Sequence, residues 1–377
     1  MIKVAEVISD TNIGGAGRLL ISKIKNSNKK LFKYTVILPK NSLLIPSLKE
    51  AGAGIVEIQG CRDSSFDFKG FIEIYDIIKR LSPDILNSHA CIVSRIVGKL
   101  TGVKVNLYTR HCDFPISKVL SSPIVKILIR IFNDIFSDGI IAVSYSAKRN
   151  LLLLGINGKK IKVIINGADK IKRISDIEKK KIKAGLGIPQ NATVVSIFAR
   201  LEDYKDHKTF LRAAKQLSSF DNVYFLIVGT GSLELELKRY ARVLGIEKRV
   251  LFLGFVKDIS PLINITDINV NCSIGTETSS LALSEGMGIG VPAIASDYSG
   301  NRYIVKDGIN GLIFPQKDYR ALAKKIMLLS QNEKKRIQLS QNSVKRFQKE
   351  LNAKRMTFET EKYYISKLKE RNISYSR

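Results

Sequence analysis

Residues 1–18 are MIKVAEVISDTNIGGAGR, and this stretch decides the fold class. The apolar run Lys3–Ile8 predicts a buried strand, which is followed by a turn containing Gly14, Gly15 and Gly17 and then by helix-compatible sequence. Glycine has no side chain, so such a turn lets backbone N–H groups approach an anion at a helix N-terminus. A plain strand-to-helix connection is the alternative, because the spacing differs from the G-x-G-x-x-G dinucleotide motif.

The same strand–helix alternation continues along the chain and then restarts. Short apolar runs between amphipathic, lysine-rich stretches are typical of a parallel sheet covered by helices on both faces. Because 377 residues exceed what one core usually organises, we expect two doubly wound α/β domains. We place the first over residues 1–170 and the second over residues 171–350, with a charged linker at 170–183. A basic helix over residues 351–377 is expected to pack back on the first domain or lie on a membrane.

The further strands that this pattern predicts are Tyr34–Leu38, Ile55–Ile58, Ile85–Leu86, Lys104–Tyr108, Gly139–Val143 and Lys162–Ile165 in the first domain, and Thr193–Phe198, Val223–Val228, Val250–Phe252, Ile268–Val270 and Ala293–Ala295 in the second. Open sheets of this class bind ligands at the carboxyl ends of their strands, and two of them leave a crevice between those edges. Functional side chains are therefore expected directly after these strands.

The chain is strongly basic, with 62 Lys+Arg against 34 Asp+Glu and a net charge of +28. This excess favours an anionic partner, and nucleic acid and the anionic membrane surface are the two candidates. Tryptophan is absent and no basic stretch is rich in aromatic residues, so no nucleic acid is expected. A merely solvated, lysine-rich surface remains the alternative to membrane binding.

No spanning helix and no targeting segment is expected. The apolar stretch Phe114–Phe136 is interrupted by Lys118, Lys126 and Arg130, and we interpret it as a helix packed on the first sheet, with a membrane contact as the alternative. Glu6 falls where a signal peptide would have its apolar region. A cytoplasmic protein, peripheral on the inner face of the cell membrane, is the expectation.

The four cysteines lie far apart without a Cys-x-x-Cys pair, so neither a disulfide framework nor a zinc site is predicted. They are Cys61, Cys91, Cys112 and Cys272, and we expect all of them to be small buried residues.

Two of the three histidines, His89 and His111, follow expected strands of the first domain. A histidine at a strand end can hydrogen-bond a sugar hydroxyl, or it can be a satisfied polar residue in a turn. In the second domain Arg200 and Lys205 follow the first strand, where a guanidinium and an ammonium could meet a diphosphate. Gly229 lies in another strand–glycine turn.

Two carboxylates follow a later strand of the second domain. Glu277 precedes an expected helix that begins near Ser279, with Thr278 or Ser279 as its cap, and Glu285 lies about two turns further on. The pair could bind hydroxyls at two ends of an extended ligand, such as a sugar and a ribose. A surface glutamate and a helix glutamate of no special function would have the same spacing.

At this point the chain resembles the GT4-type family of retaining glycosyltransferases. The matching stretches, in chain order, are GGAGR (14–18), TRH (109–111), AVS (142–144), INGAD (165–169), Arg200 with Lys205, VGTG (228–231), FLGF (252–255), Glu277 with Glu285, GVP (290–292) and DGINGL (307–312). The resemblance implies the GT-B fold, in which two Rossmann-like domains face each other across a central cleft. It also implies an acceptor-binding first domain and a nucleotide-sugar-binding second domain.

The resemblance implies roles for individual residues. Arg200 and Lys205 look like the pair that neutralises the donor diphosphate, and Glu277 is similar to the glutamate that holds the donor sugar. Glu285 is similar to the ribose-binding glutamate, and His111 to the first-domain residue that faces the sugar. The further positions are Gly14, Gly15, Ser280 and Leu281 for the donor phosphates, Gly229 for the donor without a more specific role, Phe255 and Val256 for the base, and His89 and Arg18 for the acceptor.

The expected reaction is transfer of a sugar from a nucleotide-sugar, a UDP-sugar by preference, to a lipid-linked glycan in cell-surface polysaccharide biosynthesis. In this family the acceptor hydroxyl attacks on the face that the nucleotide leaves. No Asp-x-Asp metal motif is present, so neither a metal nor a cofactor is expected. Tyr303 and Gly286 depart from the family's usual glutamate and alanine. A UDP-sugar epimerase of the same fold and a non-enzymatic basic protein that binds anionic lipid or nucleic acid are the alternatives.

Overall fold

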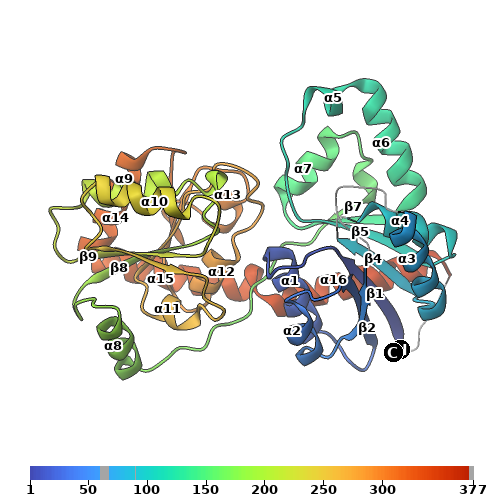
Figure 1. Ribbon diagram of the computed structural model, residues 1–377, viewed down its shortest axis with the longest axis horizontal. Coiled ribbons are helices and arrows are strands. Elements are labelled where there is room, and N and C mark those ends of the chain that lie inside the picture. Colours follow the sequence, from blue (N-terminus) through green and yellow to red (C-terminus); the bar gives the residue numbers. More distant parts are fainter. Residues whose placement is uncertain (60–67, 90, 373–377) are drawn as a thin grey trace. The chain divides into compact units, whose positions relative to one another are not determined.

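The computed structural model describes residues 1–59, 68–89 and 91–372, and the chain divides into two compact units. Unit 1 comprises residues 1–167 together with the chain from residue 353 onward, and unit 2 comprises residues 168–352 (Figure 1). The two crossings therefore fall at Gly167–Ala168 and at Asn352–Ala353. Each unit is an α/β layer structure around its own parallel sheet.

Unit 1 is built on a seven-stranded sheet in the order β3-β2-β1-β4-β5-β6-β7, and each neighbouring pair is parallel. The strands are β1 (Ile2–Ile8), β2 (Phe32–Pro39), β3 (Gly54–Ile58), β4 (Ile85–His89), β5 (Val105–Arg110), β6 (Gly139–Ala142) and β7 (Ile161–Val163). The order reverses between β1 and β4, which creates the gap at the carboxyl edge where such sheets bind ligands. His89 ends β4, and His111 directly follows β5.

Helices cover both faces of this sheet. Figure 1 shows α3 and α4 on one side and α1 and α16 on the other. The helices of unit 1 are α1 (Gly15–Lys25), α2 (Ile45–Glu50), α3 (Phe68–Leu81), α4 (Ile92–Leu100), α5 (Lys118–Ser121), α6 (Pro123–Phe136), α7 (Tyr145–Leu153), the 3-10 turn η1 (Gly158–Lys160) and α16 (Ala353–Glu370). Helix α16 packs so closely that a Cβ on Gly139 would meet the Tyr363 hydroxyl at 2.1 Å.

The stretch Phe114–Phe136 forms α5 and α6, and only one side of α6 is covered. Asn133 is buried and accepts a hydrogen bond from the Arg95 guanidinium at 2.9 Å, so this side packs toward α4. The other side exposes large apolar residues, among them Ile124 at 70% and Leu128 at 59%. The sequence predicted that this stretch packs on the first domain as a helix, and the structure shows such packing for one face of α6 only.

Unit 2 is built on a six-stranded parallel sheet in the order β10-β9-β8-β11-β12-β13. Its strands are β8 (Thr193–Phe198), β9 (Val223–Val228), β10 (Val250–Gly254), β11 (Ile268–Asn271), β12 (Ala293–Ser296) and β13 (Gly311–Phe314). Successive residues of β8 point to opposite faces of the sheet and enter different cores: Val195 packs with α9 and α14, and Val194 packs with α11. Burial on both faces explains why these strands are near-continuous apolar runs.

The helices of unit 2 are α8 (Asp176–Gly185), the 3-10 turn η2 (Asp203–Lys205), α9 (His207–Gln216), α10 (Glu234–Val243), α11 (Ser260–Asn264), α12 (Leu281–Gly288), α13 (Asn301–Ile304), α14 (Tyr319–Gln331), α15 (Glu333–Arg346) and the π-type turn η3 (Phe347–Leu351). Ser175 caps α8 in a reciprocal capping box with Glu178, which explains why a chain with six basic residues between 170 and 181 still starts a helix there. The order of strands reverses between β8 and β11.

The cysteines differ in burial. Cys91 and Cys272 are buried free thiols, as expected, but Cys112 is only half-buried, because it lies in the loop that leaves the sheet after β5. Cys61 lies outside the described residues. Within the described ranges, every helix is too short or too polar to cross a lipid bilayer.

Candidate active site

The reversal point of the unit 2 sheet brings the sequence candidates together. Strands β8 and β11 are neighbours, with Val270 paired to Ile197, so the loops that follow them leave the same edge side by side. The β8 loop carries Arg200 and Lys205, and the β11 loop carries Glu277. Residues 72 positions apart in the sequence are thus within contact distance.

Lys205 and Glu277 form a buried ion pair at this edge. The Lys205 Nζ donates to Glu277 Oε2 at 2.6 Å, and both side chains are largely covered. Asn271 Nδ2 and Ser273 Oγ donate to the same oxygen at 3.2 and 3.1 Å. Burial alone would raise the pKa of Glu277, but Lys205 and these two hydrogen bonds outweigh it and hold the pKa below its ordinary value. The carboxyl is therefore ionised at neutral pH.

Arg200 is exposed beside this pair, and Tyr204 connects the two loops. The Arg200 guanidinium donates to the Tyr204 hydroxyl, and Lys205 Nζ lies 5.3 Å from the centre of the Tyr204 ring. The Tyr204 carbonyl accepts from the Ile274 N–H at 2.9 Å. One residue thus links the cations to the glutamate loop. Two cations and a tyrosine at one sheet edge can bind a diphosphate.

Helix α12 begins one or two residues later than the sequence indicated. Its N-cap is Ser280, whose side chain accepts from the Leu283 N–H at 3.4 Å, so the predicted caps Thr278 and Ser279 were wrong. The shift leaves Leu281 as the first helical residue, and the N–H groups of this first turn form the positive end of the helix dipole. Glu285 is buried on the same helix, 7% exposed.

The glycine turn after β9 serves the cation loop by packing. A Cβ on Gly229 would meet the Ala199 carbonyl oxygen at 2.1 Å, and one on Gly231 would meet that of Leu201 at 2.4 Å. Gly229 has a φ of +139° and its N–H donates to the Gly254 carbonyl at 2.8 Å. Only glycine permits this approach, and the two backbones together position Arg200. Beyond β10, Phe255 is exposed and Val256 half-buried.

A second glycine contact positions Glu277, and the sequence analysis missed it. A Cβ on Gly300 would meet the Thr278 carbonyl oxygen at 2.1 Å. Thr276, directly before Glu277, has a φ of +49°, which strains a β-branched residue, and its N–H donates to the Tyr298 hydroxyl at 3.1 Å. Tyr298 and Gly300 therefore hold the glutamate loop in a strained shape. The Tyr-Ser-Gly stretch after β12 was the signal that could have indicated this.

Replacing Gly300 with alanine is expected to move the Glu277 loop, because the new Cβ and the Thr278 carbonyl cannot occupy the same space. Unit 2 should lose about 1–3 kcal/mol of unfolding free energy, and the activity should fall. Gly185→Ala is the control, since its Cβ would meet nothing within 4 Å at the end of α8. Urea unfolding monitored by circular dichroism measures the stability of both variants. Equal stability of the two variants would contradict the prediction.

The two departures from the family pattern have packing explanations. A Cβ on Gly286 would lie 2.9 Å from Asn269 Nδ2, which donates to the Ala282 carbonyl at 2.8 Å, so an alanine would displace this amide. The Tyr303 hydroxyl donates to Glu350 Oε2 at 3.1 Å, and the Arg346 guanidinium lies 5.2 Å from the ring centre. Both residues are thus engaged within the body of unit 2.

In unit 1 the two histidines meet at the carboxyl edge of the sheet. His89 Nδ1 and His111 Nε2 are 2.7 Å apart, and His89 Nε2 lies 2.7 Å from Glu6 Oε2. His89 is the buried last residue of β4, not a turn residue after it, and both of its ring nitrogens are engaged. Burial and the neighbouring His89 lower the pKa of His111 well below its ordinary value, so this ring is neutral at neutral pH.

Glu6 is the centre of this network, and sequence reasoning used it only against a signal peptide. It is fully buried; Oε1 accepts from Lys23 Nζ at 2.6 Å and from the Tyr364 hydroxyl at 3.0 Å, and Asn87 Nδ2 donates to Oε2 at 2.8 Å. Burial opposes ionisation, but Lys23 and His89 lower the pKa of Glu6 to about 2. The sequence did contain a signal for this buried residue, namely a single glutamate at the centre of an apolar strand.

The glycine turn of unit 1 begins α1 with Gly14 as its N-cap. Gly17 is closely packed, because a Cβ there would come within 2.5 Å of the Leu44 side chain, which would have to move. At Gly15 a Cβ would meet nothing within 4 Å, so packing inside the unit does not require glycine there. Arg18 is half-buried on the first turn of α1.

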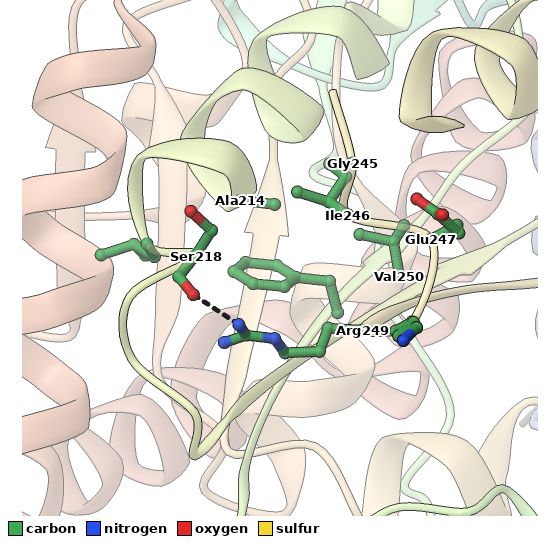
Figure 2. A pocket seen from close by; sticks show the side chains of 10 residues that line it. Ala214, Ser218, Gly245, Ile246, Glu247, Arg249 and Val250 are labelled. Carbon is green, nitrogen blue, oxygen red and sulfur yellow. Dashed lines mark hydrogen bonds between the residues drawn. The ribbon is translucent and has the colours of Figure 1, made fainter. Parts of the chain in front are cut away.

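Figure 2 shows a pocket of unit 2 that lies away from these residues. It has a volume of about 250 Å³ and lies at the end of α9 and the start of β10, where Arg249 donates to the Phe220 carbonyl at 2.6 Å. This is the amino edge of the sheet, opposite to the edge that carries Lys205 and Glu277. In the described part of the chain, no cluster of three or more His, Cys, Asp or Glu could hold a metal ion.

Two α/β units, each built on a parallel sheet, with two cations and a buried carboxylate at the carboxyl edge of the second sheet, define a glycosyltransferase of the GT-B fold. Residues 178–346 match the family described as Glycosyl transferases group 1, and residues 13–170 match Glycosyltransferase Family 4. The chain belongs to this GT4-type family and is a glycosyltransferase.

Named relatives and a solved structure agree with this assignment. The chain is 28% identical to the Escherichia coli UDP-Gal:alpha-D-GlcNAc-diphosphoundecaprenol alpha-1,3-galactosyltransferase, over 84% of this chain and 85% of the relative. It is 26% identical, over 88% and 90%, to the Campylobacter jejuni GalNAc-alpha-(1->4)-GalNAc-alpha-(1->3)-diNAcBac-PP-undecaprenol alpha-1,4-N-acetyl-D-galactosaminyltransferase. The fold is similar to that of Anabaena HepE in complex with UDP-glucose, with a TM-score of 0.84 at 20% identity over 97% of this chain and 100% of HepE.

Proposed function

We propose that this enzyme transfers a sugar from a UDP-sugar to a lipid-linked glycan during the synthesis of a cell-surface polysaccharide. The observation that carries the proposal is the Lys205–Glu277 pair at the reversal point of the unit 2 sheet, with Arg200 exposed beside it. The named relatives support the substrate classes, since one uses UDP-Gal and both act on undecaprenol-linked acceptors.

The proposed roles follow the chemistry of each group. Arg200 and Lys205 neutralise the donor diphosphate, helped by the N–H groups of Ser280 and Leu281 at the start of α12. A Glu277 carboxylate can accept hydrogen bonds from sugar hydroxyls, and the buried Glu285 can do the same for the ribose. The open space at Gly15 suits a close approach of the donor to the backbone of Gly14 and Gly15.

The remaining roles concern the sugar, the base and the acceptor. The neutral ring of His111 would face the donor sugar, with His89 behind it, while Arg18 would contact the acceptor. The exposed Phe255 and the neighbouring Val256 would receive the base.

The proposed chemistry relies on charge stabilisation of the leaving diphosphate, which a guanidinium and an ammonium supply without a divalent cation. The acceptor hydroxyl attacks the anomeric carbon on the face from which UDP departs. The bond to UDP breaks, the new glycosidic bond forms, and the departing phosphate takes the hydroxyl proton, so that the configuration is retained. We place the enzyme on the inner face of the cell membrane, where its net charge of +28 would attract it to anionic lipid.

The test is an assay of UDP release with a panel of UDP-sugars, with and without an undecaprenol-linked glycan. Acceptor-dependent release is expected, and sugar conversion without acceptor would instead indicate an epimerase. Glu285→Gln is expected to raise the Kd for UDP about 10- to 100-fold, because an amide is a weaker acceptor of ribose hydroxyls than a carboxylate. Calorimetric titration with UDP measures the affinity.

The control for Glu285→Gln is Glu247→Gln, at the amino edge of the same sheet in the pocket of Figure 2. It should bind UDP like the unmodified enzyme. Equal affinity of all three proteins, with unchanged circular dichroism spectra, would show that Glu285 does not bind the ribose.

A further inference from the structure

Helices α5 and α6 present an apolar surface to solvent. Its residues are Val119, Ile124, Ile127, Leu128, Ile131 and Ile135, each between 48% and 70% exposed, and we call it the α5–α6 apolar face. The five α6 members recur at positions i, i+3, i+4, i+7 and i+11, so they lie on one side of the helix. Contiguous exposed apolar surface of this kind marks an interaction site.

The opposite side of α6 explains how the helix is held while this face stays exposed. The Arg95 guanidinium carbon lies 4.8 Å from the centre of the Phe132 ring, and Ile129 packs with Leu151 of α7 and the β5–β7 core. Figure 1 shows α6 beside α7 at one end of unit 1. The helix is therefore apolar on two sides, and its inner side already satisfies the packing of unit 1.

Exposed basic side chains occur on the helices of the apolar face and on α7 beside them. Lys118 on α5 is exposed, as are Arg130 on α6 and Arg149 on α7. The acidic residues between 114 and 153 are Asp134 and Asp138. Asp134 pairs with Arg130 at 3.6 Å and with Lys160 at 3.3 Å, and Asp138 accepts from Arg371. The surroundings of the face are thus positive overall.

We propose that the α5–α6 apolar face docks the enzyme on an anionic lipid bilayer, with α6 lying in the interface. Apolar residues on one side of a helix with lysine and arginine at its borders are what such helices use: the side chains enter the acyl boundary and the cations meet lipid phosphates. At 14 residues, α6 is roughly 21 Å long, too short to span the bilayer. A second copy of the chain fits less well, because it would bring two positive faces together.

This proposal rests on the proposed function for its purpose, because an undecaprenol-linked acceptor is confined to the bilayer. Its test does not depend on that function. The full chain is sedimented with vesicles of phosphatidylglycerol and phosphatidylcholine, and with phosphatidylcholine vesicles alone, at increasing salt. We expect binding to the anionic vesicles that weakens with salt and little binding to the neutral ones.

The variant Ile127→Gln/Leu128→Gln/Ile131→Gln should lower the partition coefficient on the order of 100-fold, because three apolar side chains no longer gain from entering the acyl boundary. The matched control is Leu235→Gln/Val243→Gln on α10 of unit 2, where both residues are at least 77% exposed. It should bind like the unmodified chain. All of these positions are exposed, so the fold should be retained.

Three results would overturn the proposal: no sedimentation of the unmodified chain with anionic vesicles at low salt, equal sedimentation of the triple variant, or a dimer of the unmodified chain that the triple variant abolishes. Transfer to a water-soluble acceptor analogue should be unchanged in the triple variant, whereas transfer to vesicle-embedded acceptor should fall. Vesicle binding without any sugar transfer would support the docking surface and refute the proposed function.

Discussion

The variant Lys205→Met is expected to lower kcat/KM for sugar transfer by about 100- to 1,000-fold. The side chain keeps its length but loses the charge that would meet the donor diphosphate. It also loses the donor that holds Glu277 Oε2 at 2.6 Å. Steady-state kinetics with the donor found in the UDP-sugar screen measure the effect.

The pH profile separates these two losses. Lys205 lowers the pKa of Glu277 against the effect of burial, so removing it should raise that pKa. If Glu277 must be ionised for activity, the variant loses activity at a higher pH than the unmodified enzyme. The acid limb of its pH profile should therefore shift to higher pH. An unchanged acid limb would show that the ionisation of Glu277 does not limit the rate.

The control for Lys205→Met is Lys208→Met, three residues further on. Lys208 forms an exposed pair with Glu236 at 2.6 Å, and pairs of this kind contribute little. Its kcat/KM should stay within about twofold of the unmodified enzyme. The double variant Lys205→Met/Glu277→Gln should lose less than the product of the single losses, because the two residues act as one unit.

The variant Glu6→Gln is expected to destabilise unit 1 by about 3–5 kcal/mol at neutral pH, because it leaves Lys23 and His89 buried without their carboxylate. Glu57→Gln, at an exposed residue of the edge strand β3 in the same sheet, is the control and should change stability by less than about 0.5 kcal/mol. Urea unfolding monitored by circular dichroism compares the two. If Glu6→Gln were as stable as the control, the network would not stabilise the unit.

The pH dependence of this difference follows from the lowered pKa of Glu6. A carboxyl whose pKa falls from 4.5 in the unfolded chain to about 2 in the fold stabilises the protein above pH 4.5. That contribution is lost as the pH falls from 4.5 towards 2. The gap between the unmodified chain and Glu6→Gln should therefore narrow over this range, and a constant gap would contradict the prediction.

The same variant tests the link from Glu6 to the site. Glu6 orients His89, and His89 in turn meets His111 at 2.7 Å, so the His111 ring depends on a residue in the centre of β1. Tyr364 of α16 donates to Glu6 as well, which makes the C-terminal helix part of the same network. This arrangement is recognisable only in three dimensions, because its members are up to 358 residues apart.

Local patterns were sufficient for most of the strands and for the α/β class, although β13 (Gly311–Phe314) was not predicted. Lys3–Ile8 with its glycine turn indicated a buried parallel strand, and β1 covers Ile2–Ile8. The predicted α/β class is confirmed, because period and turn chemistry are properties of neighbouring residues. The GT-B fold, which the family resemblance implied, is confirmed as well. Strand ends were less certain: the predicted Ile85–Leu86 extends to His89, since polar residues can end a strand when tertiary partners satisfy them.

The three residues that gather at the carboxyl edge of the unit 2 sheet were predictable, but the residues that support them were not. Arg200, Lys205 and Glu277 carried a charge pattern after strands, which the sequence displays. Tyr298 and Gly300 have no such mark, because their importance lies in the backbone they approach from another strand. The cap of α12 was predicted one or two residues early, because Thr278, Ser279 and Ser280 have the same capping chemistry and tertiary contacts choose among them.

The sequence by itself determined the alternation of strands and helices, the family and the residues that carry charge, because each of these depends on residue type and short-range spacing. Only the tertiary structure decided that Glu6 is the buried centre of the histidine network and that one side of α6 remains uncovered. Both depend on which distant segments pack together. Pairing of this kind is a property of the folded chain: a glutamate in an apolar strand is visible in the sequence, but its distant partners are not.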